Sequence, residues 1–424
     1  MIPVRNKINK NLKNEIIAGF TTFFTMAYIM FVHPDILANT GMNKNALIAV
    51  TCIVTAVATL MVGIFGKVPI AMAPGLGLNS FFTYSLVLGE KISWETALGI
   101  VFLSGVLFLI LTSLGIRKKL VEAIPKSMIF SITVGIGIFI SFIGFKNLGL
   151  IVPNEATIVG IGEFSPTVVI GITGLIITII LEIFKIRGAL LIGIISSTIL
   201  SLIFGYSTFP EKIISTNVTV MPIAFKLDIA GALKWSLSGA IFSMMFIDMF
   251  DSIGTLVGCY FKLGRMEDQK SGSINRLLTL DAIATIFGAV MGTSTTTSYM
   301  ESAAGIEAGG KTGTTSIVTG ILFLLGLLFI PLIGIVPSFA TAPALIMVGL
   351  YMTREIVHIN FKDIEEAFPA FITILMIALS FSISTGLALG FIAYTLLKIV
   401  RFKFSELNLT LVVIAVLSLI FLIF

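Results

Sequence analysis

Several carboxylates lie within or between long apolar stretches, where a charge is costly. Asp248 and Asp251 belong to one apolar run, and Glu301 directly follows the hydroxyl-rich run 293–298 and Tyr299-Met300. An ionised carboxylate at membrane depth costs several kcal/mol unless it faces a cavity, a partner or a ligand. Thr-rich backbone before Ser-Ala-Ala-Gly also predicts an extended segment that runs into a short helix. Broken spans of this kind often mark binding sites in transporters.

The carboxylates are not equivalent candidates. Glu301 is favoured because the neighbouring apolar stretches contain no Lys or Arg that would hold it as a structural partner. Asp248 lies three residues before Asp251, so both are expected on one helix face. We expect Asp251, beside Gly254, to contact a ligand, whereas Asp248 bonds to threonines of a facing span or takes part in proton coupling. Asp281 is expected to be a structural acceptor.

Composition predicts a polytopic helical membrane protein. The chain is 57% hydrophobic and 12% charged, with a mean hydropathy of +1.08. Apolar runs of about 20 residues, enough to cross a bilayer, recur from end to end. The net charge of +5 does not indicate nucleic-acid binding, because the basic residues cluster in short loops. Cys52 and Cys259 lack metal-ligand spacing and are expected to be packing residues. We expect no metal, no cofactor and no enzymatic activity.

About fourteen membrane-spanning segments are expected, two of them broken. Residues 68–79 carry two prolines and two glycines ahead of the short apolar run 80–88, and residues 292–313 form the second broken segment. Residues 407–424 form either an extra span or an interfacial helix. Continuous spans are expected at residues 15–32, 46–65, 94–114, 124–145, 166–184, 189–204, 232–260, 277–291, 314–333, 339–352, 364–381 and 385–400.

Basic loops fix the expected orientation. With the N-terminus in the cytoplasm, all four basic clusters lie on the cytoplasmic side. This agrees with the excess of Lys and Arg in the cytoplasmic loops of membrane proteins. About seven spans per half then give an inverted repeat, whose broken third and tenth elements meet near the midplane. Asn79 and Glu301 are expected where the two short helices begin. The basic clusters are Arg117-Lys118-Lys119, Lys185/Arg187, Lys262/Arg265/Lys270 and Lys398/Arg401/Lys403.

Two further patterns receive a structural interpretation. His33 and His358 fall at span ends and are expected at the membrane interface. Residues 305–312 match the phosphate-binding pattern G-x-x-x-x-G-K-T, but that pattern has meaning only between a strand and a helix of an α/β domain. Here it lies between apolar spans, so nucleotide hydrolysis is not expected.

The sequence resembles the AzgA-like adenine/guanine/hypoxanthine permeases, a branch of the nucleobase–cation symporters. The resemblance covers nearly the whole chain, and its motifs are specific only in combination. It is carried by EIIAGFTTFFTMAYIM from Glu15, APGLGLN ending at Asn79, DSIGT from Asp251, and ESAAGI from Glu301 with GGKTG ending at Gly313.

The resemblance implies a multi-pass protein of the cell membrane with a core domain (residues 1–119 and 229–335) and a gate domain (120–228 and 336–424). It implies a purine base bound between the third and tenth spans by Asp251 and Glu301. It also suggests a homodimer through the gate domain. The other residues nominated for base contact are Asn79, Gly77, Met300 and Thr297.

A purine edge suits such groups. Two side-by-side N–H donors can bond one carboxylate, and an asparagine amide supplies the opposite polarity. Two carboxylates near one neutral ligand do not both ionise easily, so one is expected to carry a proton. Asp251, Glu301 and Asp248 are the candidates for this coupling, with sodium as the alternative ion. The rival interpretations are an anion carrier of the same fold and a membrane prenyl-transfer enzyme that binds Mg²⁺ through Asp248 and Asp251.

Overall fold

The computed structural model describes residues 2–115, 124–215, 218–264 and 273–423. The predicted all-α polytopic class is confirmed: within these residues, nine helices are long and apolar enough to cross a membrane. Arg117-Lys118-Lys119, Arg265 and Lys270 lie outside the described residues. The helices of the first half are α1 (Ile2–Met26), α2 (Ile29–Ala38), α3 (Lys44–Met61), α4 (Leu76–Ser80), α5 (Trp94–Ser113), α7 (Lys126–Leu148), α8 (Pro166–Ile183) and α9 (Ala189–Ile203).

The second half continues the helical bundle. Its helices are α10 (Ile229–Ala232), α11 (Ser238–Lys262), α12 (Ser273–Met291), α13 (Ser302–Glu307), α14 (Gly313–Gly326), α15 (Ile330–Gly334), α16 (Ser338–Thr353), α17 (Ile364–Ser380), α18 (Ile383–Val400) and α19 (Leu409–Ile423). Short helical turns adjoin several of them, including η1 (Val62–Gly66), η2 (Phe81–Gly89) and η6 (Arg354–His358).

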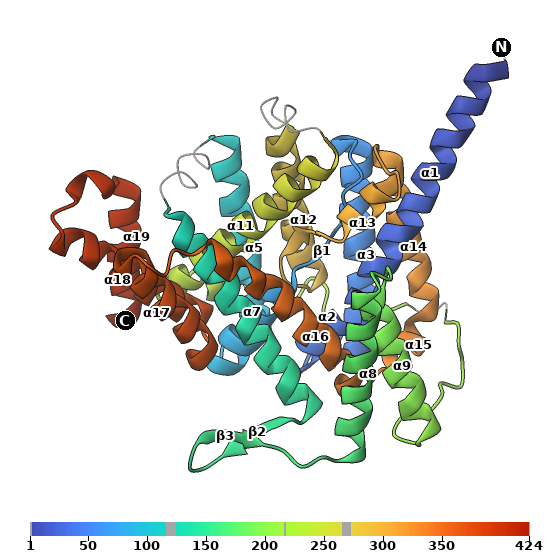
Figure 1. Ribbon diagram of the computed structural model, residues 1–424, viewed down its shortest axis with the longest axis horizontal. Coiled ribbons are helices and arrows are strands. Elements are labelled where there is room, and N and C mark those ends of the chain that lie inside the picture. Colours follow the sequence, from blue (N-terminus) through green and yellow to red (C-terminus); the bar gives the residue numbers. More distant parts are fainter. Residues whose placement is uncertain (1, 116–123, 216–217, 265–272, 424) are drawn as a thin grey trace.

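Figure 1 shows how these elements are distributed. The first turns of α1 project beyond one end of the bundle, and a hairpin of β2 (Ile151–Asn154) and β3 (Ile158–Ile161) projects from the opposite end. Helices α17–α19 lie on the side far from α1 and α14. Helix α19 occupies the apolar tail; its 15 residues span about 22 Å, less than the roughly 30 Å of a bilayer core.

The two broken segments meet, as predicted. Strand β1 (Met72–Pro74) pairs antiparallel with β4 (Thr296–Ser298), with Ala73 opposite Thr297. Each strand leads into a short helix, α4 or α13. Gly75 permits the close crossing, because a Cβ there would lie 2.9 Å from the Thr297 methyl group. This strand pair satisfies backbone groups that the interrupted helices leave open, which makes non-helical backbone tolerable within a membrane protein.

The first span is also broken, which the sequence interpretation missed. Helix α1 ends at Met26, a turn at Ala27-Tyr28 follows, and α2 begins at Ile29. The expected end at His33-Pro34 was wrong, because α2 continues through Pro34 to Ala38. Proline removes one N–H from a helix interior, which neighbouring groups in a helical bundle can compensate. The break places Tyr28 at the centre of the bundle.

His33 is a core residue rather than an interfacial one. Its side chain is fully buried, with Nδ1 2.6 Å from the Thr51 hydroxyl and Nε2 2.7 Å from the Thr293 hydroxyl. Thr51 donates its own proton to the Leu47 carbonyl, so His33 donates from Nδ1 and accepts from Thr293 at Nε2. His33 therefore connects α2 and α3 to the start of the second broken segment. His358, by contrast, is exposed.

Small residues allow the long helices to approach closely. A Cβ on Gly137 of α7 would lie 2.7 Å from the Gly349 carbonyl of α16. A Cβ on Gly193 of α9 would lie 1.9 Å from the Thr178 hydroxyl of α8. Close backbone contact of this kind favours the association of helices inside a membrane. The hydrophobic effect does not drive helices together there, because lipid tails are as apolar as the helix faces. Helix α16 is thereby held along its length against α7.

Candidate functional site

A cavity of about 490 Å³ lies at the crossing of the broken segments. One wall comes from Tyr28, from Gly75–Gly77 at the start of α4, from α11, and from residues 297–301 between β4 and α13. The opposite wall comes from α8, from α16 and from the first residue of η6. The residues of this second wall are Glu182, Val348, Tyr351, Met352 and Arg354.

Glu301 faces this cavity and is held from the protein side by Tyr28. It occupies the position that immediately precedes α13, as predicted. The Tyr28 hydroxyl donates a 2.5 Å hydrogen bond to Glu301 Oε1. Tyr28 is almost completely buried, so this bond fixes the carboxylate from the protein side. Sequence reasoning missed Tyr28, because its only signal is a hydroxyl in an otherwise apolar stretch whose break was not foreseen.

Asp251 lines the same cavity as Glu301, and we call the wall that carries these two carboxylates the acidic wall. Asp251 is exposed to the cavity, and Thr297 lies beside it in the cavity lining. The two carboxylates are close enough for their charges to interact. Met300, with 48% of its side chain exposed, lines the same cavity, and so does Gly77. Five of the residues nominated from the sequence therefore meet at one cavity.

Asp248 points elsewhere. It is 1% exposed and accepts a 3.2 Å hydrogen bond from Thr285 on α12. The expectation that it shares a face with Asp251 holds only in part, because a separation of three residues turns the two side chains about 60° apart. The alternative expectation, a bond to a facing threonine, is what the structure shows. Asp281 is fully buried beside Ser252 and close to Asp248; neither carboxylate lines the cavity.

Asn79 is buried behind the cavity wall. The Ser294 hydroxyl donates to its Oδ1, and the side chain is fully buried. It lies within α4, three residues after the helix begins at Leu76, so its position is not equivalent to that of Glu301. Its amide is within the wall rather than on the surface, and contact between Asn79 and a ligand stays a prediction.

The G-x-x-x-x-G-K-T stretch binds an internal carboxylate. It runs from α13 to Thr312, which directly precedes α14. The Glu15 carboxylate accepts the N–H groups of Lys311 and Thr312 at 3.0 and 3.3 Å and the Thr315 hydroxyl at 2.5 Å. An anion at a helix N-terminus is stabilising. The chain's own carboxylate therefore fills the position that a phosphate would take.

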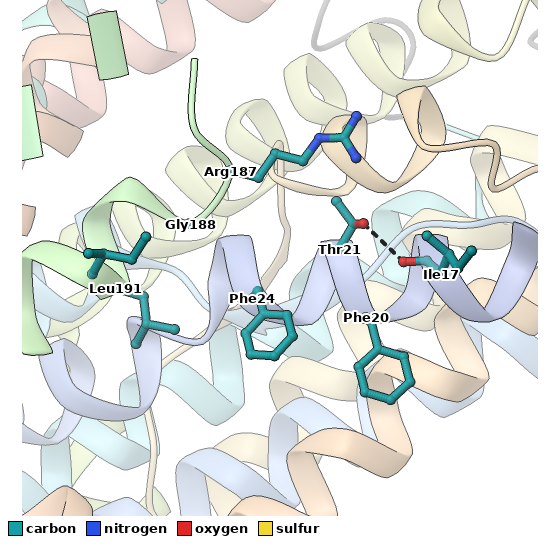
Figure 2. A pocket seen from close by; sticks show the side chains of 8 residues that line it. Ile17, Phe20, Thr21, Phe24, Arg187, Gly188 and Leu191 are labelled. Carbon is teal, nitrogen blue, oxygen red and sulfur yellow. Dashed lines mark hydrogen bonds between the residues drawn. The ribbon is translucent and has the colours of Figure 1, made fainter. Parts of the chain in front are cut away.

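A second hollow, of about 420 Å³, lies between α1 and α9. Figure 2 shows Phe20 and Phe24 of α1 together with Leu191 of α9 and Arg187, which precedes α9, among its lining residues. The Thr21 hydroxyl donates to the Ile17 carbonyl of its own helix at 2.9 Å. This hollow offers apolar surface and one cation, so it lacks the converging polar groups that a site for a small polar ligand needs.

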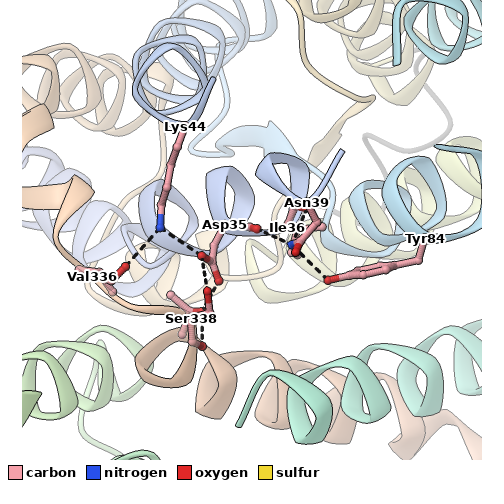
Figure 3. Close-up of polar contacts among 8 residues, drawn as sticks. Asp35, Ile36, Asn39, Lys44, Tyr84, Val336 and Ser338 are labelled. Atoms are coloured by element: carbon pink, nitrogen blue, oxygen red, sulfur yellow. Dashed lines mark hydrogen bonds and ion pairs between the residues drawn. The ribbon is translucent and has the colours of Figure 1, made fainter. Parts of the chain in front are cut away.

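At its first turn, away from the cavity, α16 contacts α2. Asp35 of α2 accepts hydrogen bonds from Ser338 and Thr341 at 2.9 and 2.8 Å and from Lys44 at 3.1 Å. Lys44 also donates to the Val336 carbonyl at 3.3 Å (Figure 3). Asp35 is 5% exposed. Helix α16 therefore contacts α2 at its first turn and borders the open cavity at its last turn.

Known proteins resemble this chain over nearly its whole length. A family model described as "Permease family" matches residues 13–389. The chain is 40% identical to the adenine permease AdeP of Escherichia coli, over 97% of this chain and 93% of that protein. It is 38% identical to the guanine/hypoxanthine permease PbuO of Bacillus subtilis, over 96% of each chain. The chain belongs to the nucleobase–ascorbate permease family. A putative permease of Methanocaldococcus jannaschii is 45% identical over 97% of this chain and 94% of that protein.

Solved structures support the fold of this permease. The transmembrane domain of the bicarbonate transporter BicA from a cyanobacterium matches with a TM-score of 0.62 at 14% identity, covering 90% of this chain and 97% of that one. SLC26A9 matches with a TM-score of 0.64 at 11% identity, covering 93% of this chain and 66% of that one. The predicted seven-plus-seven inverted repeat is the fold of these proteins. The relatives are permeases, which excludes the prenyl-transfer alternative, and the described residues contain no cluster of three metal-ligating side chains.

Proposed function

We propose that this permease imports purine nucleobases, namely adenine, guanine and hypoxanthine, by secondary active transport. The observation that carries the proposal is the pair of carboxylates, Asp251 and Glu301, on one wall of a cavity at the crossing of two broken spans. Relatives named for adenine and for guanine/hypoxanthine support the substrate class. The site would work in the cell membrane with the N-terminus in the cytoplasm.

The arrangement suits the edge of a purine. The Tyr28 hydroxyl donates to Oε1 of Glu301, and a carboxylate has further lone pairs with which to accept a base N–H. Asp251, exposed to the same cavity beside Thr297, offers a second acceptor. Hydrogen bonds from N–H groups to an ionised carboxylate are about twice as strong as neutral ones. A cavity of about 490 Å³ is of the size that small ligands occupy.

Proton coupling would follow from the same pair. Two carboxylates in a shared cavity repel each other when both are ionised, so one of them would bind a proton. The proton lowers the negative charge of the cavity and so eases the approach of a neutral base. We propose Asp251 as the main proton carrier, with Glu301 as the principal ligand and Asp248 behind Asp251 as an auxiliary group. The proton would then be released to the cytoplasm together with the base.

Transport would proceed by movement of the two walls. The proposed core, residues 1–119 and 229–335, contains the acidic wall, and the proposed gate, residues 120–228 and 336–424, contains α8 and α16. In the described structure the Asp35 contact joins core and gate at one end, while the cavity separates them at the other. This is the arrangement expected of one end-state of an alternating-access carrier. Release of the Asp35 contact would open the opposite side.

An anion carrier on the same fold is the main rival, because BicA is a bicarbonate transporter and SLC26A9 an anion transporter. Those likenesses concern the fold. In this chain Asp251 and Glu301 would repel an anion, and like charges disfavour a wrong ligand by several kcal/mol. The sequence-level relatives are named for bases rather than anions.

Uptake of labelled hypoxanthine into proteoliposomes tests the function. We expect an imposed inward proton gradient to drive accumulation. Unlabelled adenine and guanine should reduce it, and sulfate in excess should not. If no labelled base enters, or if sulfate abolishes the uptake, the proposed substrate class is wrong.

A further inference from the structure

We infer that Arg354 supplies the positive charge that pairs with the Asp251 and Glu301 carboxylates while the carrier reorients without base. On this inference, which rests on the proposed symport function, the guanidinium pairs with the acidic wall when the site closes without base and proton. Arg354 is the first residue of η6, directly after α16 ends at Thr353. It lines the same cavity as Asp251 and Glu301, but from the opposite wall.

The position of Arg354 is fixed by its neighbours on the gate side. Its guanidinium lies over the Tyr351 ring, 5.1 Å from the ring centroid. Tyr351 in turn lies close to Glu182 near the end of α8, and both line the cavity. Tyr351 also lies within electrostatic range of Glu301. A cation held on an aromatic face is pre-organised without being neutralised, so the guanidinium stays available to a carboxylate on the facing wall.

The charges of the cavity are unevenly divided. Among the described lining residues, Arg354 is the one basic side chain; the core wall contributes Asp251 and Glu301, and Glu182 adds a third carboxylate on the gate side. Within the described chain, no ion pair joins Arg354 to a carboxylate. Arg354 is exposed, whereas Lys398, on the same side of the proposed gate, is buried in ion pairs. Arg354 is therefore the cation free to change partners when the walls approach.

The inference follows from what closing the cavity requires. With a base and a proton bound, the acidic wall has lost part of its charge and its hydrogen-bonding needs are met. Without them, closing would bury ionised carboxylates, which is strongly unfavourable unless they are paired. A guanidinium can form a bidentate pair with a carboxylate. Approach of Arg354 would thus permit the empty carrier to close and reorient, and loading would displace it.

Net uptake and exchange separate this role from a structural one. Net uptake requires the empty carrier to return, whereas exchange of labelled external hypoxanthine for unlabelled internal hypoxanthine does not. We expect Arg354→Gln to lower gradient-driven net uptake at least tenfold while exchange stays within about twofold of wild type. Arg354→Lys keeps the charge and should retain most net uptake. Lys362→Gln is the matched control, since Lys362 is an exposed gate cation outside the cavity.

The outcomes are distinguishable. Loss of net uptake with retained exchange, rescued by lysine, supports the inference. Equal loss of both activities in Arg354→Gln, or net uptake unchanged in it, overturns the inference while leaving the permease function standing. If Arg354→Gln cannot be purified folded, full net uptake by an Arg354→Met variant overturns it in the same way. If wild type shows neither uptake nor exchange of hypoxanthine, adenine or guanine, the proposed function fails and the inference fails with it.

Discussion

The Tyr28 hydroxyl donates a 2.5 Å hydrogen bond to Glu301 Oε1 and joins two residues 273 positions apart in the sequence. Tyr28 lies in the break between α1 and α2, and Glu301 lies at the end of the second broken segment. The contact joins the points at which these two spans are interrupted. It therefore fixes the orientation of the acidic group that we propose binds the base.

Removing this hydroxyl should weaken base binding. In Tyr28→Phe the Glu301 carboxylate loses a charge-assisted bond, which is typically worth about 1.5–3 kcal/mol. We expect the KM for hypoxanthine uptake to rise about tenfold, with the amount of folded protein unchanged. Tyr206→Phe is the control, because Tyr206 is an exposed tyrosine outside the cavity. An unchanged KM in Tyr28→Phe would show that this bond does not position the ligand group.

Asp251→Asn tests proton coupling. The amide cannot exchange a proton, but it has nearly the same shape and can still accept a hydrogen bond. We expect the variant to equilibrate labelled hypoxanthine across the membrane and to exchange it, without concentrating it in response to an imposed proton gradient. The measurement is the ratio of internal to external base at steady state. Accumulation by Asp251→Asn equal to that of wild type would remove Asp251 from the proton-carrier role.

The contact at the far end of α16 should contribute to stability in this state. Asp35→Ala deprives Lys44, Ser338 and Thr341 of their shared acceptor. The loss of bonds to a buried charge should lower the free energy of unfolding by about 2–3 kcal/mol. We expect the melting midpoint of purified protein to fall by several degrees, with Glu155→Ala, at an exposed position, as the control. A midpoint equal to that of the control would mean that the contact is energetically neutral.

Glu15 should stabilise α14 rather than leave space for a nucleotide. Glu15→Ala removes the acceptor for the N–H groups of Lys311 and Thr312 and for the Thr315 hydroxyl, so we expect a loss of about 2 kcal/mol. Glu15→Gln keeps an acceptor oxygen and should lose less. Thermal melting measures both variants, and Mg²⁺-ATP should leave the wild-type midpoint unchanged. A midpoint raised by Mg²⁺-ATP would contradict the structural interpretation of the G-x-x-x-x-G-K-T stretch.

The membrane class, the broken third and tenth elements and most of the cavity residues could be predicted from the sequence. Buried charge and helix-breaking residues are visible in a single chain, because each is locally unfavourable without a tertiary reason. Glu301 and Asp251 were found in this way, whereas Gly77, Met300 and Thr297 were nominated through the family resemblance. The family resemblance agreed with these physical signals.

What the sequence did not reveal depends on contacts between distant elements. The break at Tyr28 carries no glycine, and Pro34, which suggested a helix end, lies inside α2. His33 was misplaced because its two threonine partners come from α3 and from the second broken segment. Arg354 was missed since a basic residue at a span end is ordinarily interfacial. In each case the deciding partner lies in another segment, which periodicity within one span cannot identify.

Equilibrium binding of labelled hypoxanthine to purified protein tests the central claim most directly, because it separates ligand recognition from transport. Wild type should bind saturably, and Glu301→Gln should bind at least tenfold more weakly. Glu307→Gln should bind like wild type, since Glu307 lies on the same short helix, is exposed and pairs with Lys262. Equal affinity of wild type and Glu301→Gln would contradict the claim that Glu301 binds the base.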